Sequence, residues 1–435
     1  MLAHTSAARP RAAVLGLALI AAGLSACSSG DSGPVKISML TLTDSGRSKA
    51  SQDLVAAFEK ANPDIKIKIN SIAGADTDNT VKTKLATGSM EDVFMYNTGS
   101  LFNALNPDSR LNDLADQSWT ANLTPDFKPV VSTGKGLYGA PFGTVKAGAV
   151  FYNKKVYQRL GLSVPTSWPQ FIANSQKIKN AGGIAPIIQT YGDVWTSQLF
   201  VLGDFANVLA QDPQWAAKYT ANKVDYSTPP AIAGFQHLEQ AHQAGLFNKD
   251  FASITNAQGL KMLAEGKGAQ YPMLTTTIAT VAQNDPGAVN DIGVFPLPAD
   301  DPAYTRLTVW EPVALYSPKS TTGKKLDAAR KFIAFATAGQ QGCDIQNKDM
   351  VPSGPYATSA CKVPETAPAL VKDMTPYFDK KQTATALEFQ SPVKGPNLPN
   401  IAVQVGSGIS TAAKGASLYD QDVKKQAQQL GLPGW

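Results

Sequence analysis

The stretch KISMLTLTDSGRSKASQDLVAAFEKANPDIKIKINSI, residues 36–72, decides the fold class. Its two ends, residues 36–43 and 64–72, are predicted strands, and in the second one isoleucine alternates with polar residues. Residues 49–62 lie between them with apolar side chains at helical spacing, and Pro63 ends that helix. A strand, a helix and a second strand within about 35 residues are typical of a parallel sheet. The sequence therefore predicts an α/β fold.

A second series of the same kind follows further along the chain. AGAVFYN, residues 147–153, has the composition of a buried strand. Ser167 and Pro169 are typical of the first residues of a helix, and Gly182 is typical of a helix end. The 435 residues are also enough for two domains of about 100 to 200 residues each. We therefore expect a second α/β lobe.

The N-terminal residues have the pattern of an export signal. Two arginines precede an apolar run at residues 12–24. This run is too short to span a membrane, since a transmembrane helix needs about 20 residues. The following LSAC, residues 24–27, resembles the lipobox of bacterial lipoproteins. That resemblance implies a signal peptide at residues 1–26, a lipid on Cys27 and a flexible linker at residues 27–35. An ordinary signal peptide that is cut elsewhere is the alternative.

Charge and hydropathy exclude some partners. The chain has 39 lysine and arginine residues against 34 acidic ones, a net charge of +5, and the basic residues are scattered. Without a basic cluster, nucleic acid and an anionic membrane surface are not expected partners. No later apolar run approaches membrane length, so we expect contact with a membrane only through the lipid.

The cysteines that remain after Cys27 form a pair. Export would bring Cys343 and Cys361 into an oxidising compartment, where a disulfide is permitted. Such a bridge closes a short local loop and stabilises the fold by about 3 kcal/mol. Two unpaired buried thiols are the alternative.

Several phrases, in their order along the chain, resemble one family. They are FEKANPDIKIKI (58–69), DVFMYN (92–97), YGAPFGTVKAGAVFYNKKVYQRLGLSVPTSWPQF (138–171), LAEGKGAQYPM (263–273), IGVFPLP (292–298) and AARKFIAFATAGQQ (328–341). From residue 36 to about residue 430 the chain resembles the solute-binding proteins of bacterial ABC sugar importers, the maltose-binding-protein-like family. The resemblance implies a type II periplasmic-binding-protein fold with a ligand cleft between lobes joined by hinge strands. The implied lobes are residues 36–144 plus 298–347 and residues 148–292 plus 352–430.

The resemblance also implies a function. A monomeric receptor would capture a mono- or oligosaccharide outside the cell and deliver it to an ABC permease, with no cofactor and no catalysis. A receptor for another polar solute, such as a polyol phosphate, is the alternative. An exported glycoside hydrolase would need only two facing carboxylates, which the 34 acidic residues could supply. It is the weaker hypothesis, because the sequence shows no other catalytic pattern and the resemblance spans the whole chain. His237 and His242 are five residues apart and do not form a metal-binding pair on a helix.

Sugar recognition needs aromatic faces and planar polar groups. Trp195 is the first candidate, with Tyr191 and Asp193 beside it, because they follow a predicted strand whose end would form the crevice. Trp310 and Glu311 are the second candidates, at the place where the family's chain re-enters the first lobe. Packing of these aromatic residues in the core, with Glu311 as a surface carboxylate, is the alternative.

Other candidate ligand-binding residues come from loops that face the cleft in the resembling fold. They are Asp44, Ser45, Asn97, Thr98, Thr144, Lys146, Leu274 and Thr275. Asp, Ser and Asn are also common in any turn. At Leu274 and Thr275 the chain lacks the aromatic residue that the family commonly has nearby. Phe389 and Asn397 could line the C-terminal side of the cleft, although a plain loop is the favoured interpretation there.

Overall fold

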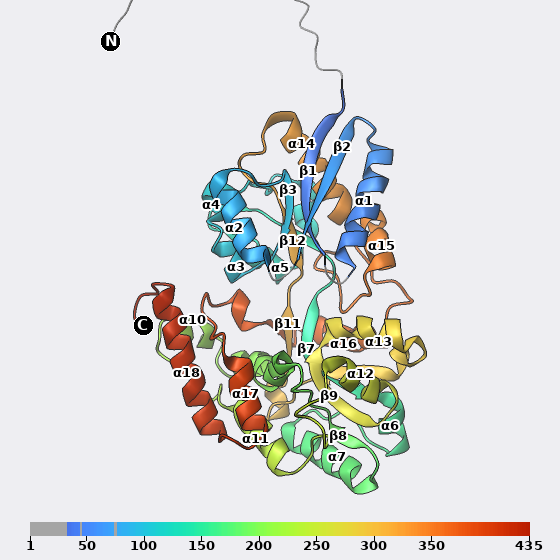
Figure 1. The fold of residues 1–435 in the computed structure, drawn as a ribbon, viewed down its shortest axis with the longest axis vertical. Coiled ribbons are helices and arrows are strands. Elements are labelled where there is room, and N and C mark those ends of the chain that lie inside the picture. The colour runs from blue at the N-terminus through green and yellow to red at the C-terminus, as the bar shows by residue number, and fades with distance from the viewer. Residues whose placement is uncertain (1–32, 44–45, 74–75) are drawn as a thin grey trace, which may run out of the picture.

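The computed structural model describes residues 33–43, 46–73 and 76–435, which form two lobes, each built around a β-sheet (Figure 1). The N-terminal strands lie in the upper lobe of Figure 1, and the C-terminal helices lie in the lower lobe. The predicted α/β fold with two lobes is confirmed.

The sheet of the upper lobe has the strand order β2-β1-β3-β12-β6. Its strands are β1 (Val35–Leu42), β2 (Ile65–Ile72), β3 (Val93–Tyr96), β6 (Ala140–Phe142) and β12 (Val313–Tyr316). β1 is parallel to β2 and β3, whereas β12 is antiparallel to β3 and β6. The helix α1 (Arg47–Ala61) connects β1 to β2 and buries Leu54, Val55 and Phe58, because helical spacing places them on one face.

The sheet of the lower lobe has the order β13-β11-β7-β9-β8, with β10 also paired to β7. Its strands are β7 (Lys146–Asn153), β8 (Ala185–Ile187), β9 (Gly268–Leu274), β10 (Ile292–Pro296), β11 (Leu307–Trp310) and β13 (Thr383–Thr385). The expected division put residues 298–347 in the first lobe, but β11 pairs with β7 and β13. β11 pairs with residues 146–148 of β7, and β10 pairs with residues 149–153 of the same strand. β11 therefore supplies hydrogen-bond partners for the part of β7 that β10 leaves unpaired. The other predicted lobe boundaries stay a prediction.

The side chains of β7 point alternately to the two faces of the lower sheet. Ala149 and Phe151 belong to a hydrophobic cluster that continues into the upper lobe. Val150 belongs to a second cluster in the lower lobe, against which Tyr152 packs. Burial on both faces explains why this strand is an uninterrupted apolar run in the sequence.

Helices cover both sheets (Figure 1). In the upper lobe they are α1, α2 (Thr77–Thr87), α3 (Ser100–Asn103), α4 (Pro107–Arg110), α5 (Phe127–Val130), α14 (Gly323–Thr337) and α15 (Gln340–Asp349). In the lower lobe they are α6 (Lys154–Arg159), α7 (Trp168–Ala181), α8 (Leu199–Gly203), α9 (Phe205–Gln211), α10 (Trp215–Thr220), α11 (Ala233–Gln243), α12 (Asn256–Ala264), α13 (Ile278–Asn284), α16 (Ala369–Asp379), α17 (Leu398–Gly406) and α18 (Ala412–Gln429).

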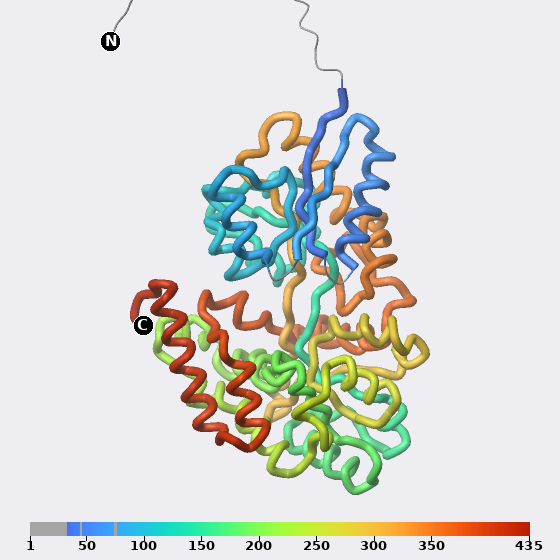
Figure 2. The backbone as a smooth tube through the Cα atoms, in the orientation of Figure 1, coloured from blue at the N-terminus to red at the C-terminus, as the bar shows by residue number. Residues whose placement is uncertain are grey.

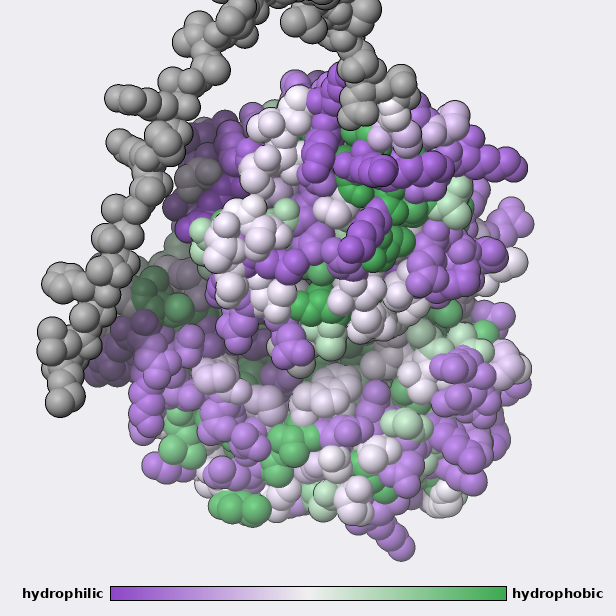
Figure 3. All heavy atoms as spheres, turned by 45° about the horizontal axis from the view of Figure 1, so that its top comes forward, coloured by the Kyte–Doolittle hydropathy of each residue, from purple (hydrophilic) through white to green (hydrophobic). Residues whose placement is uncertain are grey.

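Short elements complete the fold. They are the strands β4 (Ser132–Thr133) and β5 (Gly136–Leu137) and the 3-10 helices η2 (Ser118–Asn122), η3 (Val194–Gln198), η4 (Thr275–Thr277), η5 (Pro286–Asp291), η6 (Pro302–Tyr304) and η7 (Leu387–Phe389). Among the helices of the described ranges, none has both the length and the apolar composition for crossing a membrane. On the face shown in Figure 3, polar residues cover most of the surface, and hydrophobic residues occur in small separate groups.

The chain crosses between the lobes along neighbouring segments (Figure 2). β6 leads into β7 through residues 143–145, and β11 leads into β12 through residues 311–312. Residues 350–356 run beside the first of these segments, because the N–H of Val145 donates to the carbonyl oxygen of Pro355 at 2.8 Å. We call these segments the crossing segments, and they are where a hinge between the lobes would lie.

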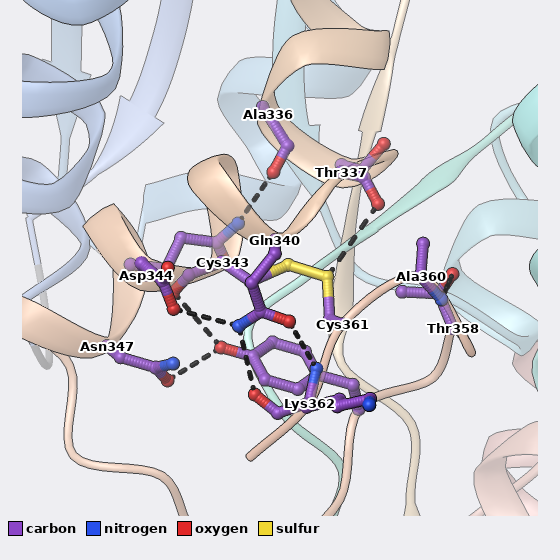
Figure 4. The surroundings of a disulfide bond; sticks show 12 residues. Ala336, Thr337, Gln340, Cys343, Asp344, Asn347, Thr358, Ala360, Cys361 and Lys362 are labelled. Atoms are coloured by element: carbon purple, nitrogen blue, oxygen red, sulfur yellow. Dashed lines mark hydrogen bonds between the residues drawn. A yellow bond between two sulfur atoms is a disulfide. The ribbon is translucent and has the colours of Figure 1, made fainter. Parts of the chain in front are cut away.

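A disulfide joins Cys343 on α15 to Cys361, with the two Cα atoms 6.0 Å apart (Figure 4). The loop that it closes contains the crossing segment 350–356. Inside this loop the hydroxyl of Tyr356 donates to the side-chain oxygen of Asn347 at 2.6 Å. The disulfide therefore ties this crossing segment to a helix of the upper lobe.

Replacing both Cys343 and Cys361 with serine is expected to lower the free energy of unfolding by about 3 kcal/mol, because the bridge restricts the unfolded chain. Scanning calorimetry of the double variant beside the wild type measures this change. As a control, a reducing agent should lower the melting temperature of the wild type and leave that of the double variant unchanged. Equal melting temperatures for the two oxidised proteins would show that the bridge contributes no stability.

Candidate functional site

A cavity between the lobes, which we call the interlobe cavity, has a volume of about 370 Å³. Small-molecule sites typically have volumes of about 300 to 1,000 Å³. Its lining comes from the upper lobe, from the crossing segments and from the lower lobe, and includes Asn97, Leu101, Lys146, Trp310, Glu388 and Phe389. A ligand in this cavity would contact both lobes.

A smaller cavity shares Lys146 with the first and has a volume of about 70 Å³. It is lined by Arg47 of α1, by Thr276 of the lower lobe and by part of the disulfide loop, including Gln346. This volume is far below that of a small-molecule site. A cavity of about 460 Å³ beside Asn70 and Lys84 also reaches the size of a small-molecule site, but its lining comes from the upper lobe alone. The interlobe cavity is of sufficient size and is lined by both lobes, which makes it the candidate ligand site in the described part of the chain.

The two lobes touch at the edge of the interlobe cavity, where Gly99 meets Phe389. A Cβ atom on Gly99 would lie 2.5 Å from Cδ1 of Phe389 and 3.0 Å from the carbonyl oxygen of Glu388. Gly99 has φ 72° and ψ −134°, a backbone conformation that residues with a side chain rarely adopt. Phe389 packs against both hydrophobic clusters. The close approach of the lobes at this point therefore requires glycine.

Trp310 lies at the end of β11, where the chain leaves the lower sheet, and is 8 % exposed. Its ring covers Gly148 of β7, where an added Cβ would lie 2.8 Å from the ring. Its indole N–H donates to Oε1 of Glu388 at 2.6 Å. Trp310 thus lines the cavity, but most of its surface is packed rather than open for stacking, and its contact with a ligand stays a prediction.

Glu311 follows Trp310, lines the same cavity and is only 3 % exposed. Its Oε2 has no hydrogen-bond partner among the described residues. Burial, together with the nearby carboxylate of Asp126, raises the pKa of Glu311 to about 8. Glu311 is therefore mostly protonated at neutral pH, and a neutral carboxyl group can both donate and accept hydrogen bonds. This environment differs from the surface carboxylate that was the alternative.

Asn97 and Thr98 follow β3 and line the interlobe cavity, and their contact with a ligand stays a prediction. The hydroxyl of Thr98 donates to the carbonyl oxygen of Pro312 at 3.2 Å, so it also holds a crossing segment. Thr144 lines the smaller cavity instead, and its hydroxyl accepts from the N–H of Ser353 at 3.1 Å. Of these candidates, Asn97 and Thr98 lie in the site, and Thr144 lies beside it.

The residues at the end of β9 line neither cavity. Thr275 is fully buried, and its hydroxyl accepts from the N–H of Ala147 at 2.8 Å. Leu274 packs against the hydrophobic cluster of the lower lobe. The next residue, Thr276, lines the smaller cavity. Direct contact of Leu274 and Thr275 with a ligand stays a prediction. In this structure the hydroxyl of Thr275 is used in the hydrogen bond to β7.

Trp195 and its neighbouring candidates Tyr191 and Asp193 lie in the lower lobe, outside both cavities. Tyr191 is buried and packs edge-on against Phe251, and burial raises its pKa well above the ordinary value. Asp193 accepts from the N–H of Asn256 at 2.7 Å, at the start of α12. Trp195 is 38 % exposed. The structure gives Tyr191 and Asp193 structural partners, and a role of Trp195 in binding stays a prediction.

Some predicted residues lie outside the described ranges, and some lining residues were not predicted. Cys27, Asp44 and Ser45 lie outside the described residues. Glu388 was missed, although it adjoins Phe389, because a loop sequence does not show which side chain meets Trp310. Asn397 is exposed at the start of α17 and lines neither cavity.

Two α/β lobes, crossing segments between them and a cavity lined by both define a two-lobed ligand-binding protein. The chain belongs to the bacterial extracellular solute-binding proteins, because the model of that family matches residues 44–341. The melibiose/raffinose/stachyose-binding protein MelE of Bacillus subtilis is 26% identical over 326 residues, which cover 72% of each chain. The multiple sugar-binding protein of Streptococcus mutans is 22% identical and covers 75% of this chain and 76% of its own.

Solved structures share the fold over nearly the whole chain. A Bacillus subtilis protein named msme, in an open conformation, has a TM-score of 0.77 and 20% identity, covering 92% of this chain and 100% of its own. RafE in complex with raffinose has a TM-score of 0.73 and 18% identity, covering 90% of this chain and 100% of its own. The predicted resemblance to the family is confirmed.

Proposed function

We propose that this protein captures a mono- or oligosaccharide outside the cell and delivers it to the permease of an ABC importer. The observation that carries this proposal is the interlobe cavity, which offers aromatic and planar polar side chains from both lobes. The names of MelE and of the multiple sugar-binding protein support a sugar as the ligand.

The proposed mechanism is a population shift. A sugar that contacts Asn97 of the upper lobe and Phe389 of the lower lobe makes both contacts only when the lobes are together. Binding therefore stabilises the closed arrangement, and a permease would recognise that arrangement. No bond is made or broken in this mechanism, and the protein acts as a monomer without a cofactor.

A thermal-shift screen over sugars, polyols and sugar phosphates tests the proposal. A ligand present at 100 times its Kd stabilises the native state by about 2.7 kcal/mol, so a bound sugar raises the melting temperature. If only a phosphorylated polyol raised it, the alternative receptor function would replace the sugar. Turnover of the bound sugar would instead support a glycoside hydrolase.

Membership of the extracellular solute-binding family supports a location of this protein outside the cytoplasm. We propose that a lipid on Cys27 anchors the protein to the outer face of the cell membrane. Cys27→Ala is expected to release most of the protein into the medium, because the lipid would be its only membrane contact. Fractionation and immunoblotting of cells and medium measure the distribution. Retention of the variant with the membrane would contradict the proposed anchor.

A further inference from the structure

Glu388 lines the interlobe cavity and is hydrogen-bonded to Trp310. Its Oε1 accepts the indole N–H of Trp310 at 2.6 Å and lies 3.7 Å from Nζ of Lys394. Its Oε2 is buried and has no hydrogen-bond partner among the described residues. Glu388 and Lys394 come from the C-terminal part of the lower lobe, and both line the same cavity as Trp310.

The ring of Trp310 is packed in the hydrophobic cluster of the lower lobe, and its N–H makes a hydrogen bond to Glu388. The ring lies directly on Gly148, where an added Cβ would be 2.8 Å from it. The residues after Trp310 cross to the upper lobe, so β11 holds the tryptophan from one side only. An indole N–H can only donate, and its bond to an ionised carboxylate is directional and stronger than a bond to a neutral acceptor.

We infer that Glu388 is a positioning residue for ligand binding, which holds the indole of Trp310 in the orientation that completes the interlobe cavity. The inference rests on the proposed function, since it concerns how the same cavity recognises its sugar. A purely direct role is the competing explanation, in which Oε2 of Glu388 accepts a sugar hydroxyl and Trp310 is not involved.

A double-mutant cycle separates the two roles. The variants are Glu388→Ala, Trp310→Phe and both together, and phenylalanine keeps a ring but lacks the N–H. Calorimetric titration uses whichever of melibiose, raffinose and stachyose the wild type binds most tightly. Glu388→Ala is expected to weaken binding about 10- to 100-fold in the wild type, the usual effect of losing a charged hydrogen bond. In the Trp310→Phe background it is expected to cost less than about 3-fold.

Two further variants test the cause. Glu388→Gln keeps an acceptor for the indole and is expected to stay within about 5-fold of the wild-type Kd. Glu365→Ala removes an exposed carboxylate outside both cavities and is expected to leave the Kd unchanged. Melting temperatures of all variants show whether a change in Kd comes from loss of folding.

The NMR resonance of the indole N–H of Trp310 reports on its hydrogen bond directly. It therefore distinguishes loss of the contact with Glu388 from a general change in stability. The resonance is assigned as the one that is missing in Trp310→Phe. It is expected to shift upfield in Glu388→Ala, because the hydrogen bond is lost, and to shift less in Glu388→Gln. This spectrum needs no ligand, so it tests the Glu388–Trp310 contact even if the proposed function fails.

The inference is wrong if Glu388→Ala weakens binding equally in the wild type and in the Trp310→Phe background, because Glu388 would then act directly on the sugar. It is also wrong if the indole resonance does not move in Glu388→Ala. If the wild type binds no sugar of any kind, the proposed function fails, while a shifted resonance would still support the contact.

Discussion

Gly99→Ala is expected to weaken sugar binding about 100-fold, the largest change in affinity that we expect from one added methyl group. The new Cβ would lie 2.5 Å from Phe389 and 3.0 Å from the backbone oxygen of Glu388, both in the lower lobe. Backbone atoms cannot rotate away as a flexible side chain can. The lobes must therefore separate at this point, and the cavity loses its fit to a ligand that contacts both of them.

The matched control is Gly88→Ala. Gly88 also lies in the upper lobe with a positive φ of 68°, but no atom lies within 4 Å of an added Cβ. Both variants carry backbone strain of about 1 kcal/mol or more, so both should melt at a lower temperature. Calorimetric titration should show a changed Kd for Gly99→Ala alone. Equal Kd values for the two variants would show that the contact between the lobes does not matter for binding.

Glu311→Gln is expected to make the protein more stable than the wild type at alkaline pH, by about 5 kcal/mol. The ordinary pKa of a glutamate is 4.5, and burial raises that of Glu311 to about 8 in the folded protein. Below pH 4.5 the carboxyl is neutral in both states and its contribution to stability is complete. As the pH rises from 4.5 to 8, the unfolded chain loses its proton first, so that contribution is lost. Glutamine has no proton to lose.

Chemical denaturation of both proteins at pH 5 and at pH 8.5 measures this difference. The two proteins should differ little at pH 5, and the variant should be the more stable at pH 8.5. Other carboxyls with a raised pKa, Asp204 and Asp420, are present in both proteins and cancel in the comparison. Glu365→Gln, at an exposed site, serves as the control and should follow the wild type. A constant difference at the two pH values would contradict a raised pKa for Glu311.

Local patterns predicted the elements of the fold well. The stretch at 36–72 predicted two parallel strands joined by a helix, because the spacing of apolar residues and Pro63 specify them locally. The structure has β1, α1 and β2 there. Local patterns did not predict the lobe to which β11 belongs. That depends on a long-range pairing, in which β11 takes the part of β7 that β10 leaves unpaired.

The candidate site was predicted only in part, for physical reasons. Trp310, Glu311, Asn97 and Thr98 line the cavity, since they lie at or just after the ends of strands near the crossing segments. Tyr191 does not, because a tyrosine after a strand can equally turn into the core, where it packs on Phe251. The burial of Glu311 could not be predicted from the sequence either. Its exposure depends on how the lobes and the crossing segments meet, and not on the residues next to it in the chain.

Calorimetric titration of the wild-type protein with neutral sugars, including melibiose, raffinose and stachyose, tests the central claim most directly. Glycerol 3-phosphate is titrated in parallel, and the sugar is recovered afterwards and analysed. We predict that at least one sugar binds with one site per chain and a Kd of about 1 µM or below, equivalent to about 8 kcal/mol, and that it is recovered unchanged. Binding of the phosphate alone, or cleavage of the sugar, would contradict the account.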